Sequence, residues 1–365
     1  MPSQILHILF GEDVIDEIYR RIGPRFGIVA DKALKKIKKD LDASFALGCQ
    51  GPDLFYHSQK RRPVGVEYGS LLHRRGAGIF TAGLLNMGLP DPPPSKEDIE
   101  AGRREKSINA LGVYALGFMT HAILDRKSHP YIVYKAESRH HAFFERIIDA
   151  LMLKRLRGGD ISLYGGQEVL KETCENPPSG LKELLEKALV LAFPERAGND
   201  KKLKARIDNT FADCADFYFL TDPQKAPYSG GKGGAGGSLV SPEMVPYLFP
   251  VKISRNIDFL NLEHRSWYSP VSGGAESRLS FPELYSGAVD AAAGAMCPFI
   301  VRYLDTGNFP ILEAAQAIGN GGLSVVDSQG RPAAAVHRNP LPLDDVLEEQ
   351  LRLRSGLYIF KTDVS

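Results

Sequence analysis

One apolar stretch, residues 107–124 (SINALGVYALGFMTHAIL), limits the possible folds of this chain more than any other segment. It could form several helical turns, but Asn109, Thr120 and His121 interrupt it, which favours a buried helix over a membrane span. A helix that is apolar on nearly every side has to be covered by other elements. The sequence therefore predicts a large helical core, and 365 residues are enough to build one.

Apolar residues recur three and four positions apart along most of the chain, which is typical of amphipathic helices. The pattern predicts helices at 12–22, 31–48, 66–87, 105–127, 140–157, 180–193, 201–220, 250–262 and 281–305.

Two segments interrupt this helical pattern. Pro92–Pro94 exclude a helix, and the glycine-rich segment 229–238 is predicted as an exposed loop. From Asn320 the pattern changes to a predicted small hairpin, a short helix at 343–354 and a last strand at 356–362. We therefore predict an all-α fold, with a multi-helix body at 1–319 and a small C-terminal extension at 320–365.

Composition narrows the compartment and the partners. The formal net charge is +1, so nothing global indicates a nucleic acid or an anionic membrane as partner. The four cysteines are scattered without a CxxC pair, which favours reduced thiols. We see neither a signal peptide nor a transmembrane segment, and we expect a cytoplasmic protein.

Histidines gather in the first part of the chain: seven of the nine lie within the first 141 residues. His121 and Asp125 are four residues apart, so on a helix their side chains project from one face. His141 and Glu145 repeat this spacing in the next predicted helix. Imidazole and carboxylate groups in this arrangement suit Zn²⁺. The alternative for either pair is an ordinary ion pair on a helix surface.

The apolar setting of Asp125 favours the metal hypothesis. A lone carboxylate on an apolar helix is costly unless a cation or hydrogen-bond donors satisfy it. The nearby cations Arg126 and Lys127 point away at i+1 and i+2, which leaves a metal ion as the simplest partner.

Four further residues are candidate ligands. His129 precedes Pro130, which predicts a loop conformation from which it could reach a second metal. Asp53 follows a Gly-Pro stop, where a structural turn is the alternative; His73 could equally be a satisfied core histidine. His7 has apolar neighbours on both sides, where a lone histidine is rare without a partner. We predict structural or surface roles for the other histidines: His57, His140, His264 and His337.

The order and spacing of these residues resemble the zinc-dependent phospholipase C family, which shares its helical fold with S1/P1-type nucleases. The motifs are His7, Asp53, His73, His121-x3-Asp125, His129 and His141-x3-Glu145, and they cover roughly residues 1–155.

The resemblance implies a centre of two to three zinc ions. Asp53, His73, His121 and Asp125 would hold the first zinc. The second would be held by His129, His141 and Glu145. A third would bind His7, with Asp125 bridging the first and third ions.

The activity that the resemblance implies is zinc-dependent hydrolysis of a phosphodiester or phosphomonoester, with phospholipid and peripheral membrane contact among the open possibilities. A hydroxide between two zincs would be the nucleophile, and Asp53 would act as base or orient it. Arg74, Arg75, Arg126 and Lys127 adjoin the ligands and could contact phosphate; solvated surface charges are the alternative.

Two other functions stay open: a single-strand nuclease of the P1 type, and a non-catalytic helical scaffold with a structural metal. The HD-type phosphohydrolases need an adjacent His-Asp pair, which this sequence does not contain.

Overall fold

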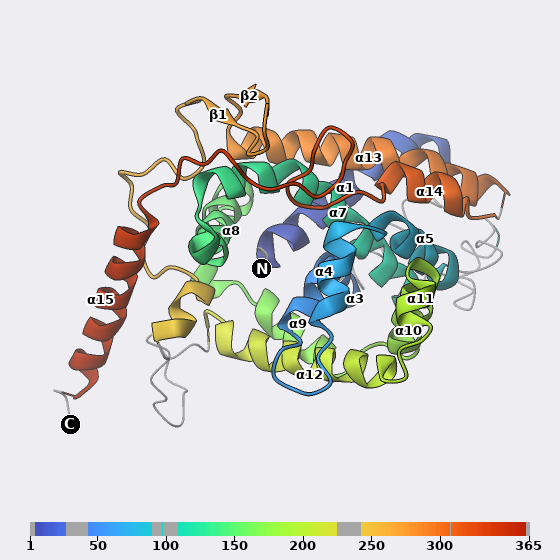
Figure 1. The fold of residues 1–365 in the computed structure, drawn as a ribbon, viewed down its shortest axis with the longest axis horizontal. Coiled ribbons are helices and arrows are strands. Elements are labelled where there is room, and N and C mark those ends of the chain that lie inside the picture. Colours follow the sequence, from blue (N-terminus) through green and yellow to red (C-terminus); the bar gives the residue numbers. More distant parts are fainter. Residues whose placement is uncertain are drawn as a thin grey trace.

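The structure, a computed structural model, describes residues 4–26, 43–89, 97, 109–224, 242–306 and 308–362. Helices make up most of it (Figure 1), so the predicted all-α fold is confirmed. In chain order the elements are α1 (Gln4–Phe26), α3 (Ser44–Cys49), η1 (Gly51–His57), α4 (Val66–Arg74), α5 (Ala77–Gly88), α7 (Ala110–Lys135), η3 (Ser138–His140), α8 (His141–Arg157), η4 (Ile161–Leu163), α9 (Gly166–Glu175), α10 (Leu181–Ala192), α11 (Pro194–Ala197), α12 (Leu203–Thr221), η5 (Pro242–Tyr247), β1 (Trp267–Tyr268), β2 (Glu276–Ser277), α13 (Phe281–Thr306), α14 (Ile311–Ile318) and α15 (Leu343–Thr362).

Helix α7 is the central element, as its apolar sequence predicts. It packs against α1, α3, α5 and α13, and nearly all of its side chains before Arg126 are buried. Figure 1 shows α13 and α14 on one side of the molecule and α9 and α12 on the opposite side. Asn109 starts the helix, because its side chain accepts a hydrogen bond from the Gly112 N–H at 2.9 Å.

Two glycines allow α3 and α7 to touch through their backbones. A Cβ atom at Gly48 would lie 2.2 Å from the carbonyl oxygen of Tyr114, and one at Gly117 would lie 2.5 Å from that of Phe45. Side chains at these positions would therefore force the helices apart. This close approach brings the chain just after α3, which carries Asp53, next to His121.

Helix α7 also extends beyond its predicted end. It runs through Pro130 to Lys135, so the prediction that His129 lies on a loop is wrong. Proline inside a helix costs about 3 kcal/mol. The following residues Tyr131, Ile132 and Tyr134 are buried, and burial of large apolar side chains stabilises by about 1.5–3 kcal/mol each. Packing therefore outweighs the local preference of the sequence.

Three other predictions are wrong. The helix expected at 66–87 is two helices, because Gly76 adopts a left-handed conformation (φ +77°) between them. Segment 250–262 is not helical; Asp258 accepts hydrogen bonds from the backbone of Leu262 and Glu263 at 2.8 Å, which competes with helix formation. The last strand expected at 356–362 is instead part of α15.

Several predicted elements agree with the structure, and some lie outside it. The helices expected at 140–157, 180–193, 201–220 and 281–305 correspond closely to α8, α10, α12 and α13, whereas α1 extends well beyond the predicted 12–22. The sequence pattern does not predict α9 and α14. Most of the predicted helix 31–48, Pro92–Pro94 and the glycine-rich loop 229–238 lie outside the described residues.

The chain after residue 319 contacts the helical body. The Leu323 N–H donates to the His73 carbonyl oxygen at 2.9 Å, and Leu343 and Val346 join the hydrophobic core. The expected hairpin is reduced to a single bridge between Val326 and Pro332. The division at residue 319 stays a prediction.

Among the described helices, α13 is long and apolar enough to cross a membrane by length and composition alone. One face of α13, including Ala288, Ala292 and Met296, is fully buried, and the helix packs against α1 and α7.

Candidate metal centre

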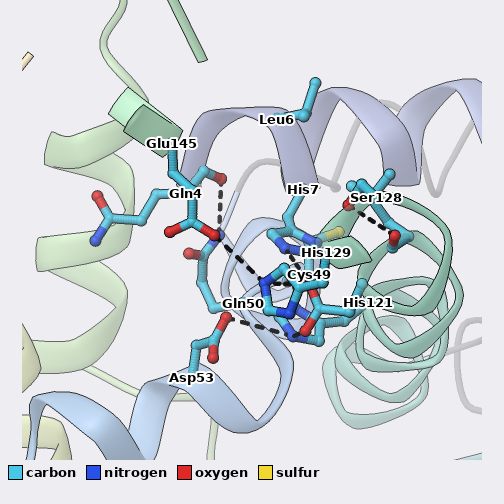
Figure 2. Close-up of polar contacts among 12 residues, drawn as sticks. Gln4, Leu6, His7, Cys49, Gln50, Asp53, His121, Ser128, His129 and Glu145 are labelled. Atoms are coloured by element: carbon cyan, nitrogen blue, oxygen red, sulfur yellow. Dashed lines mark hydrogen bonds and ion pairs between the residues drawn. The ribbon is translucent and has the colours of Figure 1, made fainter. Parts of the chain in front are cut away.

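The eight predicted ligand residues meet at one place in the fold. They come from five elements: His7 from α1, Asp53 from η1, His73 from α4, three residues from α7, and His141 and Glu145 from α8. Figure 2 shows His7, His121 and His129 gathered between α1 and α7, with Asp53 and Glu145 turned towards them.

Asp125 is the centre of this arrangement. Its Oδ2 atom lies 3.1 Å from His121 Nε2 and 3.6 Å from His73 Nε2. Its Oδ1 atom lies 3.3 Å from His7 Nε2 and 3.7 Å from His129 Nε2. The two oxygens of one carboxylate therefore face two different sets of imidazoles.

Asp53 completes the first group of potential ligands. Its Oδ1 atom is 2.9 Å from His73 Nε2, and its Oδ2 atom is 3.3 Å from His121 Nε2. Potential ligand atoms of Asp53, His73, His121 and Asp125 all lie within 4.8 Å of one another, and all four residues are buried or nearly so.

The second group is built around Glu145. Its Oε1 atom lies 3.3 Å from His129 Nε2 and 3.0 Å from His141 Nε2. This group supplies three potential ligands and borders solvent, because the side chains of His129 and His141 keep 12% and 19% of their surface exposed.

Backbone carbonyls orient two of the imidazoles. His121 Nδ1 lies 3.1 Å from the Cys49 carbonyl oxygen, and His73 Nδ1 lies 2.8 Å from that of Gly69. A carbonyl can only accept, so each Nδ1 carries the proton and each Nε2 faces the carboxylates. In a neutral imidazole that Nε2 has a lone pair, which is the orientation that metal-binding histidines adopt.

Several buried polar atoms at the centre make no hydrogen bond within the described structure. They include Asp53 Oδ2, His121 Nε2 and Asp125 Oδ2. His121 Nε2 lies within ion-pair distance of both carboxylate oxygens, 3.3 Å from Asp53 Oδ2 and 3.1 Å from Asp125 Oδ2. Since buried polar atoms almost always have partners, a cation between these three atoms could supply the missing partner.

Carboxylates and imidazoles in the first group shift one another's pKa. Burial would raise the pKa of Asp53 and Asp125, yet the facing imidazoles hold both values below their usual range. Burial would lower the pKa of His73, yet Asp53 and Asp125 raise it to about 10. The carboxylates thus attract positive charge into this site, and a divalent cation would compete with protons for it.

Local structure determines how the candidate ligands of α7 are arranged. His121, Asp125 and His129 follow one another at one-turn intervals on α7, so they share one face. Gly51 lies against that face: it has φ +56°, and a Cβ atom there would be 2.3 Å from His121 Cγ. Only glycine allows the chain to turn into η1 this close to the His121 ring.

The cations beside the ligands do not reach into the centre. The guanidinium of Arg126 donates to the carbonyl oxygens of Ile318, Gly319, Gly321 and Gly322, so it is neither a solvated surface charge nor directed at the centre. It fixes the end of α14 instead. Arg74, Arg75 and Lys127 are exposed.

The histidines with predicted structural roles lie outside the two groups. His57 is buried and stacks on Phe217 with ring centroids 4.0 Å apart, and burial lowers its pKa to about 3. His140 Nε2 lies 3.1 Å from Asp344.

Some residues around the centre were not found from the sequence. Tyr56 packs on His73 with ring centroids 4.7 Å apart. Gln4, Gln50 and Asp149 form a buried network next to His7. Their partners are more than forty residues away in sequence or are backbone atoms, so no local pattern indicates these roles.

Together, the fold and this site define an all-α protein with buried histidine and aspartate clusters that could bind metal ions. Comparisons with models of protein families, with curated proteins and with solved structures gave no match.

Proposed function

We propose that this protein is a zinc-dependent phosphoric ester hydrolase that cleaves a phosphodiester. The observation that carries the proposal is the Asp125 carboxylate, which presents one oxygen to His121 and His73 and the other to His7 and His129. A carboxylate shared in this way suits a centre of adjacent metal ions, which is the arrangement that hydrolytic sites use for phosphate esters.

The donor set favours zinc. Nitrogen and carboxylate oxygen ligands at a buried site with about four donors are typical of Zn²⁺. Asp53, His73, His121 and Asp125 would hold one ion, and His129, His141 and Glu145 a second, with His7 and Asp125 available for a third. Bound zinc would supply Lewis-acid chemistry, lowering the pKa of a water and polarising phosphoryl oxygens.

The second group favours catalysis over a purely structural metal. Structural zinc sites use four protein ligands, whereas catalytic sites use three and leave one position open. His129, His141 and Glu145 give three, and two of these side chains reach solvent. Asp53 Oδ2 has no hydrogen-bond partner within the described residues, so it can accept a proton from a water held at the centre.

The test is hydrolysis by purified, zinc-replete protein of three substrates: phosphatidylcholine vesicles, bis-p-nitrophenyl phosphate and single-stranded DNA. We expect turnover of the small diester that chelator abolishes and added zinc restores. Preferential cleavage of DNA would assign the nuclease alternative. Bound zinc without turnover on any of the three would support the scaffold alternative and refute hydrolysis.

A further inference from the structure

The first turn of α1 begins at Gln4, three residues before His7, and a carboxylate from another helix caps it. Asp149 of α8 is fully buried. Its Oδ1 atom accepts from the Leu6 N–H at 2.8 Å, and its Oδ2 atom accepts from the N–H groups of Gln4 and Ile5 at 3.2 and 3.4 Å. The first N–H groups of a helix have no partner within it, and a negative charge there is stabilising. Asp149 therefore caps α1 from a position more than 140 residues away in the sequence.

Gln4 connects the same turn to α8, to α9 and to Gln50, which lies between α3 and η1. Its side-chain oxygen accepts from Arg146 Nη1 of α8 at 2.7 Å and from Gln167 of α9. Its carbonyl oxygen accepts from Gln50 Nε2 at 3.2 Å. All of these side chains are buried.

Arg146 balances the charge of this network. Its guanidinium lies 3.7 Å from Asp149 and packs on the Phe249 ring at 4.8 Å from the centroid. It also donates to the Tyr247 carbonyl oxygen at 3.1 Å. A buried carboxylate with an adjacent cation and several N–H donors holds a defined position, because each alternative position loses several charge-assisted bonds.

The network joins the elements that carry the candidate ligands. Arg146 directly follows Glu145 in α8, Gln50 lies three residues before Asp53, and Gln4 lies one turn before His7. In Figure 2 the Gln4 side chain points away from the histidine rings, so it is not itself a ligand.

Apart from the backbone of α1, few contacts orient the His7 ring. Its Nδ1 atom makes no hydrogen bond within the described part of the chain. It stacks on His121 with ring centroids 4.0 Å apart, and its Nε2 atom faces Asp125 Oδ1 at 3.3 Å. By contrast, His73 and His121 are each oriented by a backbone carbonyl at Nδ1. The position of His7 therefore depends on the position of α1.

We infer that Asp149 is a positioning residue for the metal centre: by capping α1 it places His7 against Asp125, so that the two can share an ion. The inference rests on the metal centre of the proposed function. Loss of the cap should weaken the ion that His7 would bind and leave the ion held by Asp53, His73 and His121 unchanged.

The experiment compares wild type, Asp149→Asn, His7→Ala and Asp13→Asn as apo-proteins titrated with Co²⁺. The titration records the number of ions bound, the visible absorption spectrum and competition with a chelator. The substitution at Asp149 keeps the shape of the side chain but removes its charge. Asp13→Asn is the matched control, because Asp13 also joins α1 to α8, through Arg157 at 2.6 Å, but lies away from the first turn.

We expect Asp149→Asn to reproduce the spectral change of His7→Ala, with one ion bound about tenfold to a hundredfold more weakly, as for loss of an outer-shell partner. Asp13→Asn should bind like wild type. If Asp149→Asn does not fold, Gln50→Leu is used, which removes the bond to the Gln4 carbonyl and should show the same selective change. A wild-type spectrum and affinity in the folded variant would overturn the positioning role alone. A wild type that binds no Co²⁺ would overturn the metal centre itself.

Discussion

Gly51→Ala tests whether stability and metal binding require the turn into η1 to pack directly against the His121 ring. Gly51 has φ +56°, a conformation that costs other residues about 1–2 kcal/mol. The new Cβ atom would also lie 2.3, 2.6 and 2.7 Å from Cγ, Cδ2 and Cβ of His121. Crowding in a well-packed core costs about 1–3 kcal/mol. We therefore expect the free energy of unfolding to fall by about 2–5 kcal/mol, the sum of these two costs.

Gly158→Ala is the matched control. Gly158 has φ +65° at the end of α8, but a Cβ atom there meets nothing within 4 Å. It should lose only the conformational contribution, about 1–2 kcal/mol. The difference between the two variants then measures the contact with His121.

Urea unfolding of both variants, with chelator and with excess zinc, provides the assay. Movement of the His121 ring should weaken metal binding in Gly51→Ala, and each tenfold loss of affinity reduces the stabilisation by zinc by about 1.4 kcal/mol. Gly158→Ala should keep the wild-type stabilisation by zinc. Equal losses of stability in the two variants, with equal stabilisation by zinc, would refute the reasoning.

Three further outcomes are expected. Asp125→Ala should release metal and abolish turnover, because its one carboxylate faces both sets of ligands. A variant with full zinc content and turnover would disprove that Asp125 bridges two ions. His57→Phe should flatten the acid dependence of stability. Burial lowers the pKa of His57 to about 3 in the folded protein, so the unfolded chain takes up this proton first as pH falls below about 6.5. Between these values His57 alone removes about 1.4 kcal/mol of stability per pH unit. Chelator-treated samples unfolded at several pH values check this, and equal slopes would contradict it. Arg126→Met should lower the free energy of unfolding by about 2–4 kcal/mol, because it loses hydrogen bonds to the end of α14 but removes no candidate ligand. Unchanged stability in urea would show that these hydrogen bonds are dispensable.

The sequence is informative where local spacing alone decides the geometry. The four-residue spacing of His121 and Asp125 needs only a helix to place both side chains on one face, and the apolar pattern of α7 predicts that helix. For the candidate ligands on other elements, local patterns left structural alternatives open and the family resemblance supplied the grouping; the structure brings them together.

Predictions failed where distant packing overrides a local preference. Pro130 favours a loop at His129, but the buried side chains that follow keep the chain helical. Asp149 has no sequence signal at all, because the N–H groups that it caps lie on α1, far away in the chain. The role of Arg126 is similarly hidden, since its acceptors are backbone carbonyls.

Helix α7 sets the spacing of the candidate ligands that it carries. It carries His121, Asp125 and His129 at equal intervals of four residues, and a rise of about 1.5 Å per residue separates their Cα atoms by about 6 Å along the axis. The distance between ions on either side of Asp125 would then follow from the pitch of the helix. Substitutions of the residues around the centre would not alter that pitch. Deleting one residue between Asp125 and His129 would turn that imidazole by about 100° around the axis. The chain could therefore change what surrounds any bound ions far more easily than the distance between them.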